Sequence, residues 1–463
     1  MARYRVERDF LGPVKVPGNA YYGVETERAR KNFQISGITV PLEFIRAYAL
    51  IKRSAAKANM KEGKLDRRIG GAVVMACSEV MAGKLADQFI VDVFQAGAGT
   101  STNMNVNEVV ANRAIELLGG SKGDYKLVHP NDHVNMSQST NDSYHAAIHV
   151  ATYMAVRGSL LPALSGLEKA LHAKSVQFSK IVKIGRTHLQ DAVPIALGQE
   201  FSGYEHAISE AADRLKISCN SLLALPLGGT AVGTGIETKR EYPRDVVTEL
   251  NRATKCRFKV AENFFSMQQN QNEERWASAA LAGVAITVGK IANDLRLLSS
   301  GPVAGLGDIT LPAAQPGSSI MPGKVNPSMA EMMNMVCFEV LGKDTAVEHA
   351  AAGGQLELNV FMPLVAYNLL YSSAILSNGI SAFTERCVSG IRANTERISY
   401  YLEKDISLAT ALAPYIGYSK ASEIANEARR SGRTVKEVCI DRKIMPRDQL
   451  DKILDPASHI RPE

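Results

Sequence analysis

The chain has 463 residues, of which 46% are hydrophobic and 22% are charged, and its formal net charge is only +6. This composition is ordinary for a globular protein, and the length allows two or three parts with sizeable cores. The weak positive charge is compatible with small anionic ligands and too small to indicate nucleic acid. The sequence has no signal-peptide core and no apolar run of the roughly 18 residues that a membrane helix needs. We therefore expect a cytoplasmic protein without nucleic-acid or membrane partners.

Residues 1–138 form a first part in which short helical patterns alternate with loops rich in glycine and proline. Apolar residues recur at helical spacing over residues 40–60, 67–86 and 105–118, which predicts three short helices. We interpret this part as an N-terminal domain of mixed, short helical elements.

Residues 139–394 carry the longest helical patterns. From Leu281 to Leu298 apolar residues recur every three or four positions, which is the spacing of a bundle seam, and the pattern stops at SSGP. Three further stretches contain few helix breakers: 199–225, 328–350 and 355–392. Such long helices cannot bury their apolar stripes alone, so we expect a central bundle shared between subunits.

The last part, residues 395–463, is rich in charge and has short helical repeats, so we expect a small C-terminal helical domain. The predicted fold class is therefore all-α, in three parts. The six cysteines are widely and irregularly spaced, without a C-x-x-C pair, which favours reduced and mostly buried thiols.

Four loops of high polarity interrupt the helical patterns: GAGTSTNMN (97–105), HPNDHVNMSQSTND (129–142), GRTHLQD (185–191) and GSSIMPGKVNP (317–327). Each places hydroxyls or amides beside glycine or just before a helix, where free N–H groups and the helix dipole favour an anion. Hydroxyl, amide, imidazole and ammonium groups together suit a small polycarboxylate, and we expect neither a metal nor a cofactor. In one loop alone these residues would be ordinary helix caps, so only the four together indicate a site.

Three other patterns have structural explanations that we favour. GAGTST lacks the third glycine of a dinucleotide fingerprint, and LGGTAVGTG (227–235) lacks the Lys-Ser/Thr of a phosphate loop. We interpret the second as a structural turn or a loop beside the substrate. His145 and His149 have the spacing of metal ligands on a helix, but the glutamate of H-E-x-x-H is absent. We interpret them as packing or surface histidines.

The motifs GSSIMPGKVNP, GRTHLQD, SQSTND and GAGTSTNMNVNE together resemble the fumarase/aspartase superfamily, and the resemblance extends from AYYGVETERA (20–29) to LAPYIGY (412–418). It implies that the central bundles assemble into the twenty-helix core of a homotetramer, with each active site shared between three subunits. It also implies elimination of a small group from a four-carbon dicarboxylate.

The resemblance implies that Ser318 is the general base, which takes a proton from the carbon beside a carboxylate. A serine can do this only if N–H groups and a nearby ammonium stabilise its alkoxide. Lys324, Asn326 and Thr187 would bind one substrate carboxylate. The glycines around Ser318 imply a loop that closes over the ligand and excludes water.

The resemblance assigns the remaining polar positions as well. Hydroxyl groups would hold the second carboxylate, which becomes a dianionic aci-form: those of Thr100, Ser139, Thr140 and Ser319. Asn141 and His188 would face the leaving group, and Glu331 would be the acid paired with His188.

The leaving group is either ammonia or water, and hydroxide needs a general acid to depart, whereas ammonia does not. Fumarases that resemble this chain have serine where Ala98 stands, and the forms GAGTS and QSTND are those of aspartases. LGGTAVGTG and the segment HPND (129–132) resemble fumarases more closely, while Val303, residues 144–147 and residues 261–275 fit neither pattern. We expect an aspartate ammonia-lyase, with class II fumarase as the alternative.

Overall fold

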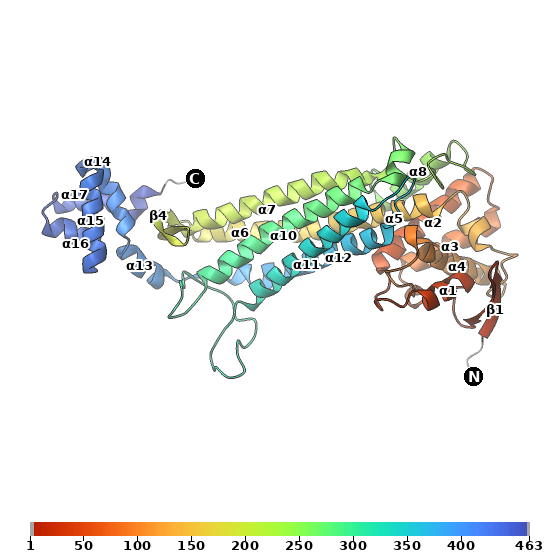
Figure 1. Cartoon of the computed structure of the whole chain (residues 1–463), viewed down its shortest axis with the longest axis horizontal. Coiled ribbons are helices and arrows are strands. Elements are labelled where there is room, and N and C mark those ends of the chain that lie inside the picture. The colour runs from red at the N-terminus through yellow and green to blue at the C-terminus, as the bar shows by residue number, and fades with distance from the viewer. Residues whose placement is uncertain (1–3, 461–463) are drawn as a thin grey trace. The chain divides into compact units, whose positions relative to one another are not determined.

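The computed structural model describes residues 4–460 and consists mainly of α-helices (Figure 1). The predicted all-α class is confirmed. Strands are few and short, and they pair within the described residues as four two-stranded sheets: β1 (Tyr4–Asp9) with β2 (Gly12–Pro17), β3 (Val182–Thr187) with β4 (Gln190–Ala196), β5 (Ala224–Leu225) with β6 (Lys259–Val260), and β7 (Ile309–Thr310) with β8 (Arg392–Ala393). None of the described helices combines the length and the apolar character needed to cross a bilayer.

The longer helices include those that the apolar periodicity predicted. They are α2 (Leu42–Lys61), α3 (Arg67–Met81), α4 (Thr100–Leu117), α5 (Thr140–Ala155), α6 (Leu161–Gln177), α7 (Leu197–Cys219), α8 (Tyr242–Thr254), α10 (Asn272–Leu298), α11 (Ser328–Ala352), α12 (Met362–Arg386) and α15 (Tyr418–Ser431). The shorter ones are α1 (Val24–Asn32), α9 (Phe264–Gln269), α13 (Thr395–Glu403), α14 (Ala413–Ile416), α16 (Val435–Asp441) and α17 (Arg447–Ile453).

The chain divides into two compact units, each made of three stretches of sequence. The first unit contains the residues up to 162 together with 213–285 and 338–377, and the second contains 163–212, 286–337 and the residues from 378 onwards. Helices α7, α10, α11 and α12 therefore each contribute residues to both units. The domain boundaries predicted after residues 138 and 394 remain predictions.

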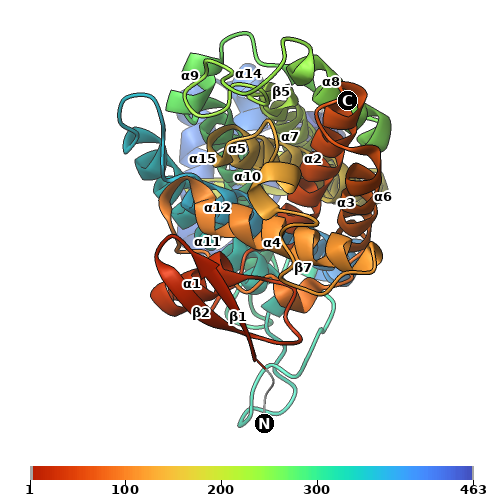
Figure 2. The same cartoon turned by 90° about the vertical axis from the view of Figure 1, so that its right-hand side faces the viewer.

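In the first unit, an aromatic cluster joins α2 to α5. Phe44, Tyr48 and Tyr144 are fully buried, and their ring centroids lie 4.6–5.9 Å apart. The β1–β2 hairpin lies against α1 (Figure 2), which in turn packs on α4. This packing fixes the N-terminal ends of α4 and α5, where two of the polar motifs lie.

In the second unit, small residues bring long helices close together. A Cβ atom added to Gly289 of α10 would lie 3.4 Å from Cβ of Cys337 in α11, and one added to Gly379 of α12 would lie 3.4 Å from Cε of Met333. Both distances are ordinary van der Waals contacts, so an alanine would already fill the space at either position.

Towards the C-terminus, helices α15, α16 and α17 gather around a hydrophobic cluster of their own (Figure 1). Its fully buried members include Leu412, Ile424, Val438 and Leu450. Local capping defines these helices: α16 starts with a capping box formed by Thr434 and Glu437, and α15 ends before Gly432 in the left-handed conformation.

Three predicted boundaries were wrong. GRTHLQD was expected to be an irregular loop, but it forms the two strand ends and the turn of the β3–β4 hairpin, because His188 and Leu189 both adopt positive φ. Six of the nine residues of GAGTSTNMN are already in α4, which begins at Thr100. The helix expected over 355–392 begins only at Met362, because the Asn359 side chain donates to carbonyls at the end of α11 and accepts from the Phe361 N–H.

All six cysteines are free, as predicted, and five are buried; Cys256 is half-buried. Burial raises the pKa of Cys77, Cys219, Cys337 and Cys387 to about 12. Arg157 Nη1 donates to the Cys256 sulfur at 3.1 Å. The buried thiols therefore serve as small apolar core residues.

Candidate active site

A polar cavity of about 440 Å³ lies in the first unit. It is lined by the first turns of α4 and α5, residues 131–138, residues 230–237 and Glu25 of α1. Three of the predicted substrate ligands, Thr100, Ser139 and Thr140, are among the lining residues. The structure thus brings together hydroxyls from motifs that are about forty residues apart in the sequence.

Helix α4 enters this cavity through a tight turn. Gly99, the residue before Thr100, has φ +86°, and a Cβ atom there would lie 2.2 Å from the ring of Tyr144. Only glycine combines this backbone conformation with such close packing against α5. The turn therefore sets the position of the Thr100 hydroxyl relative to Ser139 and Thr140.

Beneath the cavity lies a buried hydrogen-bond network centred on Lys52 of α2. Lys52 Nζ donates to Oδ1 of Asn103 and to Oδ1 of Asn135, both at 2.7 Å, and Asn103 Nδ2 donates to Thr140 Oγ1 at 3.0 Å. Burial lowers the pKa of Lys52 to about 7. Because Thr140 Oγ1 accepts from Asn103, its own hydrogen is available for a ligand.

Asp142 anchors the cavity wall to the start of α5. The Ser139 and Asp142 side chains form a capping box, with the Ser139 N–H donating to Asp142 Oδ1 at 2.9 Å. The other carboxylate oxygen, Oδ2, accepts from the N–H groups of Gly228 and Thr230 at 2.9 and 3.1 Å. Burial raises the pKa of Asp142 to about 6.

The loop LGGTAVGTG is therefore a wall of the cavity, in agreement with its interpretation as a turn or a loop beside a ligand. The predicted ligand Asn141 does not line the cavity; its Nδ2 donates to the Ala231 carbonyl at 2.7 Å. Asn141 thus ties the start of α5 to the same wall.

Thr187 and His188 lie at the exposed turn of the β3–β4 hairpin in the second unit. The hairpin is anchored by buried charges: Asp308 accepts from Arg186 Nη1 at 2.6 Å and from Lys183 Nζ at 2.9 Å. Arg186 of the GRTHLQD motif thus anchors the end of β3, directly before Thr187 and His188, to Asp308.

The loop that carries Ser318 is also in the second unit and has internal order. Ser318 Oγ accepts hydrogen bonds from the N–H groups of Ile320 and Met321 at 3.2 and 3.0 Å. The base of the loop is closed by the Gly317 N–H, which donates to the Lys324 carbonyl at 2.8 Å, and by Asn326 Nδ2, which donates to the Gly317 carbonyl at 2.7 Å. Ser319 and the Lys324 side chain are exposed.

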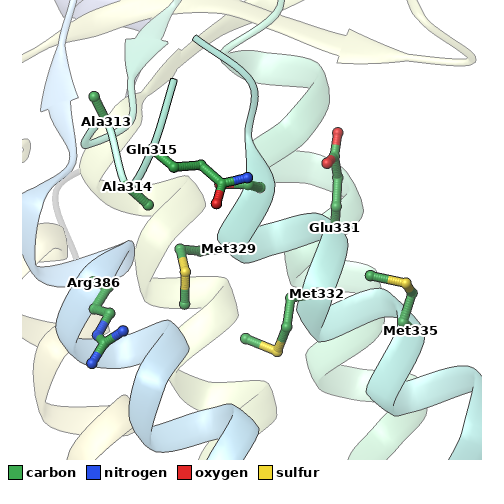
Figure 3. Close-up of a pocket in the computed structure, with 9 residues that line it drawn as sticks. Ala313, Ala314, Gln315, Met329, Glu331, Met332, Met335 and Arg386 are labelled. Atoms are coloured by element: carbon green, nitrogen blue, oxygen red, sulfur yellow. The ribbon is translucent and has the colours of Figure 1, made fainter. Parts of the chain in front are cut away.

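Glu331 lies in the first turn of α11 and lines a second cavity, of about 630 Å³, that belongs to the second unit (Figure 3). Its neighbours there include Met332, Met335, Gln315 and Arg386. His188 is not among the residues that line this cavity.

The eleven predicted site residues thus divide between the units. Thr100, Ser139, Thr140 and Asn141 belong to the first unit, and the others belong to the second: Thr187, His188, Ser318, Ser319, Lys324, Asn326 and Glu331. Within residues 4–460, no hydrogen bond or ion pair joins the side chains of Ser318, His188 and Glu331 to one another. Each unit of one chain therefore carries its own part of the polar set.

Comparison with known proteins agrees with these motifs. A family model described as "Lyase" matches residues 12–342, and one described as "Fumarase C C-terminus" matches residues 408–459. The chain belongs to the fumarase/aspartase superfamily.

Relatives within this superfamily carry two different names. The chain is 46% identical to a class II fumarate hydratase of Bradyrhizobium diazoefficiens, over 99% of this chain and 97% of the relative. It is also 46% identical to an aspartate ammonia-lyase of Bacillus subtilis, over 99% and 96%. A class II fumarase from Schistosoma mansoni has the same fold, with a TM-score of 0.96, 37% identity and 99% of each chain covered. The chain is therefore a lyase-superfamily enzyme, and overall identity does not distinguish the two activities.

Sequence reasoning missed the network beneath the superfamily's polar motifs, above all Lys52 and Asn135. A signal for Lys52 was present, because it follows Phe44 and Tyr48 at intervals of four residues on the apolar face of α2. A lysine on a buried helix face needs hydrogen-bond acceptors, so it indicates a polar site nearby. Asn135 lies in the polar loop 129–142, but nothing in the sequence distinguished it from the other amides of that loop.

Proposed function

We propose that this enzyme is an aspartate ammonia-lyase, which eliminates ammonia from L-aspartate to give fumarate in a reversible reaction. We prefer ammonia to water as the leaving group because of the charged side chains that line the cavity in the first unit. Its lining contains two carboxyl side chains, Glu25 and Glu237, and no lysine, arginine or histidine among the described lining residues.

L-Aspartate carries two carboxylates and an ammonium group, whereas L-malate carries two carboxylates and no cation. Carboxyl groups at the cavity therefore favour the amino acid over the hydroxy acid by direct attraction for the ammonium. Burial, and then the nearby Asp9 carboxylate, raise the pKa of Glu25. A bound ammonium would lower that pKa again, so binding and ionisation of Glu25 would support each other.

In the proposed mechanism, the Ser318 alkoxide takes the proton from C3 of aspartate and becomes a hydroxyl. The two N–H groups that point at Ser318 Oγ support this role, because they stabilise negative charge on the oxygen. The electron pair of the C–H bond forms the aci-carboxylate and then the double bond. The C–N bond breaks, the electron pair stays on nitrogen, and ammonia leaves.

The other polar residues would act on the two carboxylates and the leaving group. Lys324, Asn326 and Thr187 hold one carboxylate, and the hydroxyls of Thr100, Ser139, Thr140 and Ser319 stabilise the aci-form. Asn141 and His188 face the departing nitrogen, with Glu331 paired to His188. Since one chain carries these groups in separate units, the proposal includes a homotetramer in the cytoplasm whose sites combine residues of three subunits.

Class II fumarase is the second candidate, and Asn131 is the observation that favours it. Asn131 belongs to the HPND segment that resembles fumarases, and it lines the same cavity as Thr100 and Ser139. Its side chain could order a water molecule in the cavity, which a hydratase requires.

A direct assay distinguishes the two candidates. Purified enzyme is mixed with L-aspartate or with L-malate, and fumarate is followed by its ultraviolet absorbance. We expect fumarate from L-aspartate; formation of fumarate from L-malate alone would replace the proposal with its alternative.

The base is tested with Ser318→Ala, which should reduce kcat by about 10²- to 10⁴-fold without changing the melting temperature. Ser431→Ala is the control, because the exposed Ser431 hydroxyl has only local contacts: it donates to the Glu427 carbonyl and accepts from Arg433 Nε. Unchanged turnover in Ser318→Ala would rule out this residue as the base.

A further inference from the structure

The first unit contains a second polar cluster, which the proposed function does not use. His145 and His149 of α5 and Glu274 of α10 are completely buried. Glu274 Oε1 lies 2.6 Å from His145 Nε2 and 2.9 Å from His149 Nε2. One ligand atom from each of the three residues lies within 4.8 Å of the other two.

The tautomer of His149 is determined by its other ring nitrogen. Nδ1 lies 2.7 Å from the Ala224 carbonyl oxygen, which can only accept a hydrogen bond, so Nδ1 carries a hydrogen. In a neutral imidazole, Nε2 then presents a lone pair towards the Glu274 carboxylate oxygen. Two acceptors at 2.9 Å repel each other unless a cation lies between them.

The contacts around Glu274 are short, but they are not aligned as hydrogen bonds. Both carboxylate oxygens, Nε2 of both histidines and Nδ1 of His145 have no hydrogen-bond partner of acceptable geometry within the described residues. Oε1 and the two Nε2 atoms still meet at ion-pair distance, whereas burying Glu274 Oε2 and His145 Nδ1 without a hydrogen bond is costly. The cluster therefore suits a bound cation, which accepts lone pairs from several directions.

We propose that His145, His149 and Glu274 bind a divalent transition-metal ion of the zinc class, as a structural site. Two imidazoles and one carboxylate are a donor set that suits Zn²⁺ and also Co²⁺ or Ni²⁺. The His149 Nδ1–H···O=C bond to Ala224 is the outer contact that orients such a ligand. Metal–ligand bonds of about 2.0–2.2 Å would require the nitrogen–oxygen distances to open by less than about 1 Å.

A fourth ligand can come from solvent. A cavity of about 280 Å³ is lined by Ala224, whose carbonyl binds His149, and by Glu273, the neighbour of Glu274. Its other lining residues include Asn220, Ser221 and Ser266, so it is polar enough to hold water. His145, His149 and Glu274 do not line this cavity themselves, so a solvent ligand would have to enter past Ala224 and Glu273.

The metal site would join helices α5 and α10, which are far apart in the sequence. Helix α5 begins with the hydroxyls of the polar cavity, and Glu274 lies in the first turn of α10. His145 and His149 were predicted to be packing or surface histidines, and they are buried; the sequence could not associate them with Glu274, which is 125 residues beyond His149. The ion would therefore cross-link the two helices, independently of the reaction that the enzyme catalyses.

Elemental analysis of the full-length protein tests this proposal. Untagged protein is produced in medium containing Zn²⁺, passed through a desalting column and analysed for metal. We expect about one ion per chain in the wild type and in His172→Gln, and less than about a tenth of that in His145→Gln and Glu274→Gln. His172 is the matched control, since it forms a histidine–glutamate pair with Glu205 at the surface.

Protein produced with Co²⁺ provides a second measurement on the wild type alone. A tetrahedral Co²⁺ site with two imidazoles should give visible absorption that is absent from Glu274→Gln. If the substituted proteins do not fold, the wild type still decides, because wild-type protein without stoichiometric metal and without this absorption overturns the proposal. The cation between His149 and Glu274 would then be a proton. Metal retained equally in all variants would also overturn it.

Discussion

Lys52 shows how one residue links the stability of the fold to the polar cavity. Its amine has two amide oxygens as acceptors, Asn103 Oδ1 and Asn135 Oδ1, and these bonds can be made by a neutral amine as well as by an ammonium. The pKa of about 7 in the folded protein lies well below the reference value of 10.5. Between these values the unfolded chain binds more protons than the folded one, so stability rises with pH.

We therefore expect Lys52→Met to differ from the wild type in its pH dependence. Below about pH 7 the buried charge reduces wild-type stability, and this penalty is lost as the pH rises towards 10.5. Between pH 7 and 9.5, the free energy of unfolding of the wild type should rise relative to the variant by up to about 1.4 kcal/mol per pH unit. Denaturant unfolding at fixed protein concentration measures this difference.

Lys57→Met is the control for this comparison, because Lys57 is on the same helix but is only half-buried and is paired with Glu249. The difference in the free energy of unfolding between Lys57→Met and the wild type should not change between pH 7 and 9.5. A constant difference for Lys52→Met as well would mean that the buried amine stays charged in the folded protein at neutral pH.

At the scale of elements, the loop 317–327 combines exposure with an ordered base. A Cβ atom on Gly317 would lie 2.4 Å from the Lys324 carbonyl oxygen, whereas Gly323, at φ +81°, has open space around it. Alanine substitutions at Gly317 and Gly323 would therefore test two different causes of strain. One reports on the close crossing of the loop ends, and the other on backbone conformation alone.

Gly317→Ala should lower kcat by at least about tenfold while leaving the melting temperature within about 1 °C, because the loop is exposed and contributes little to the core. Gly323→Ala should have a smaller effect on kcat, since it meets no neighbouring atom. Steady-state kinetics and thermal unfolding of both variants check this. Equal losses of kcat would show that backbone strain, and not the loop crossing, positions Ser318.

Elements also show what the sequence could predict. Long apolar periodicity predicted α10 and α11 well, because a continuous buried stripe is a local property of the sequence. The β3–β4 hairpin was missed because its turn depends on positive φ at His188 and Leu189, neither of which is a typical turn residue. The cavity floor was missed because Lys52, Asn103 and Asn135 meet only through tertiary packing. Thr100, Ser139 and Thr140, which line the cavity, were singled out by their motifs, and their role as ligands stays a prediction.

At the scale of the whole molecule, the distribution of the polar set leads to a prediction about subunits. Thr140 belongs to the first unit and Ser318 to the second. If each site takes these residues from different chains, a mixed oligomer can contain sites in which both are intact.

Co-expression of Thr140→Val with Ser318→Ala should therefore restore activity that neither variant has alone, up to about a quarter of the wild-type value for random mixing. Fumarate formation by the mixed oligomer measures it, after mass spectrometry has shown that both chains are present. Verified mixed oligomers without activity would contradict a site shared between subunits.

The burial of the cysteines means that thiol labelling can report unfolding of the core. Five sulfur atoms lie out of reach of water-borne reagents while the fold holds, and the high pKa values of four of them suppress thiolate formation. Cys256 alone is partly open to solvent. A thiol-specific dye should thus label only Cys256 in the native enzyme. Each further label during unfolding would show the time at which the part of the core around another cysteine becomes exposed.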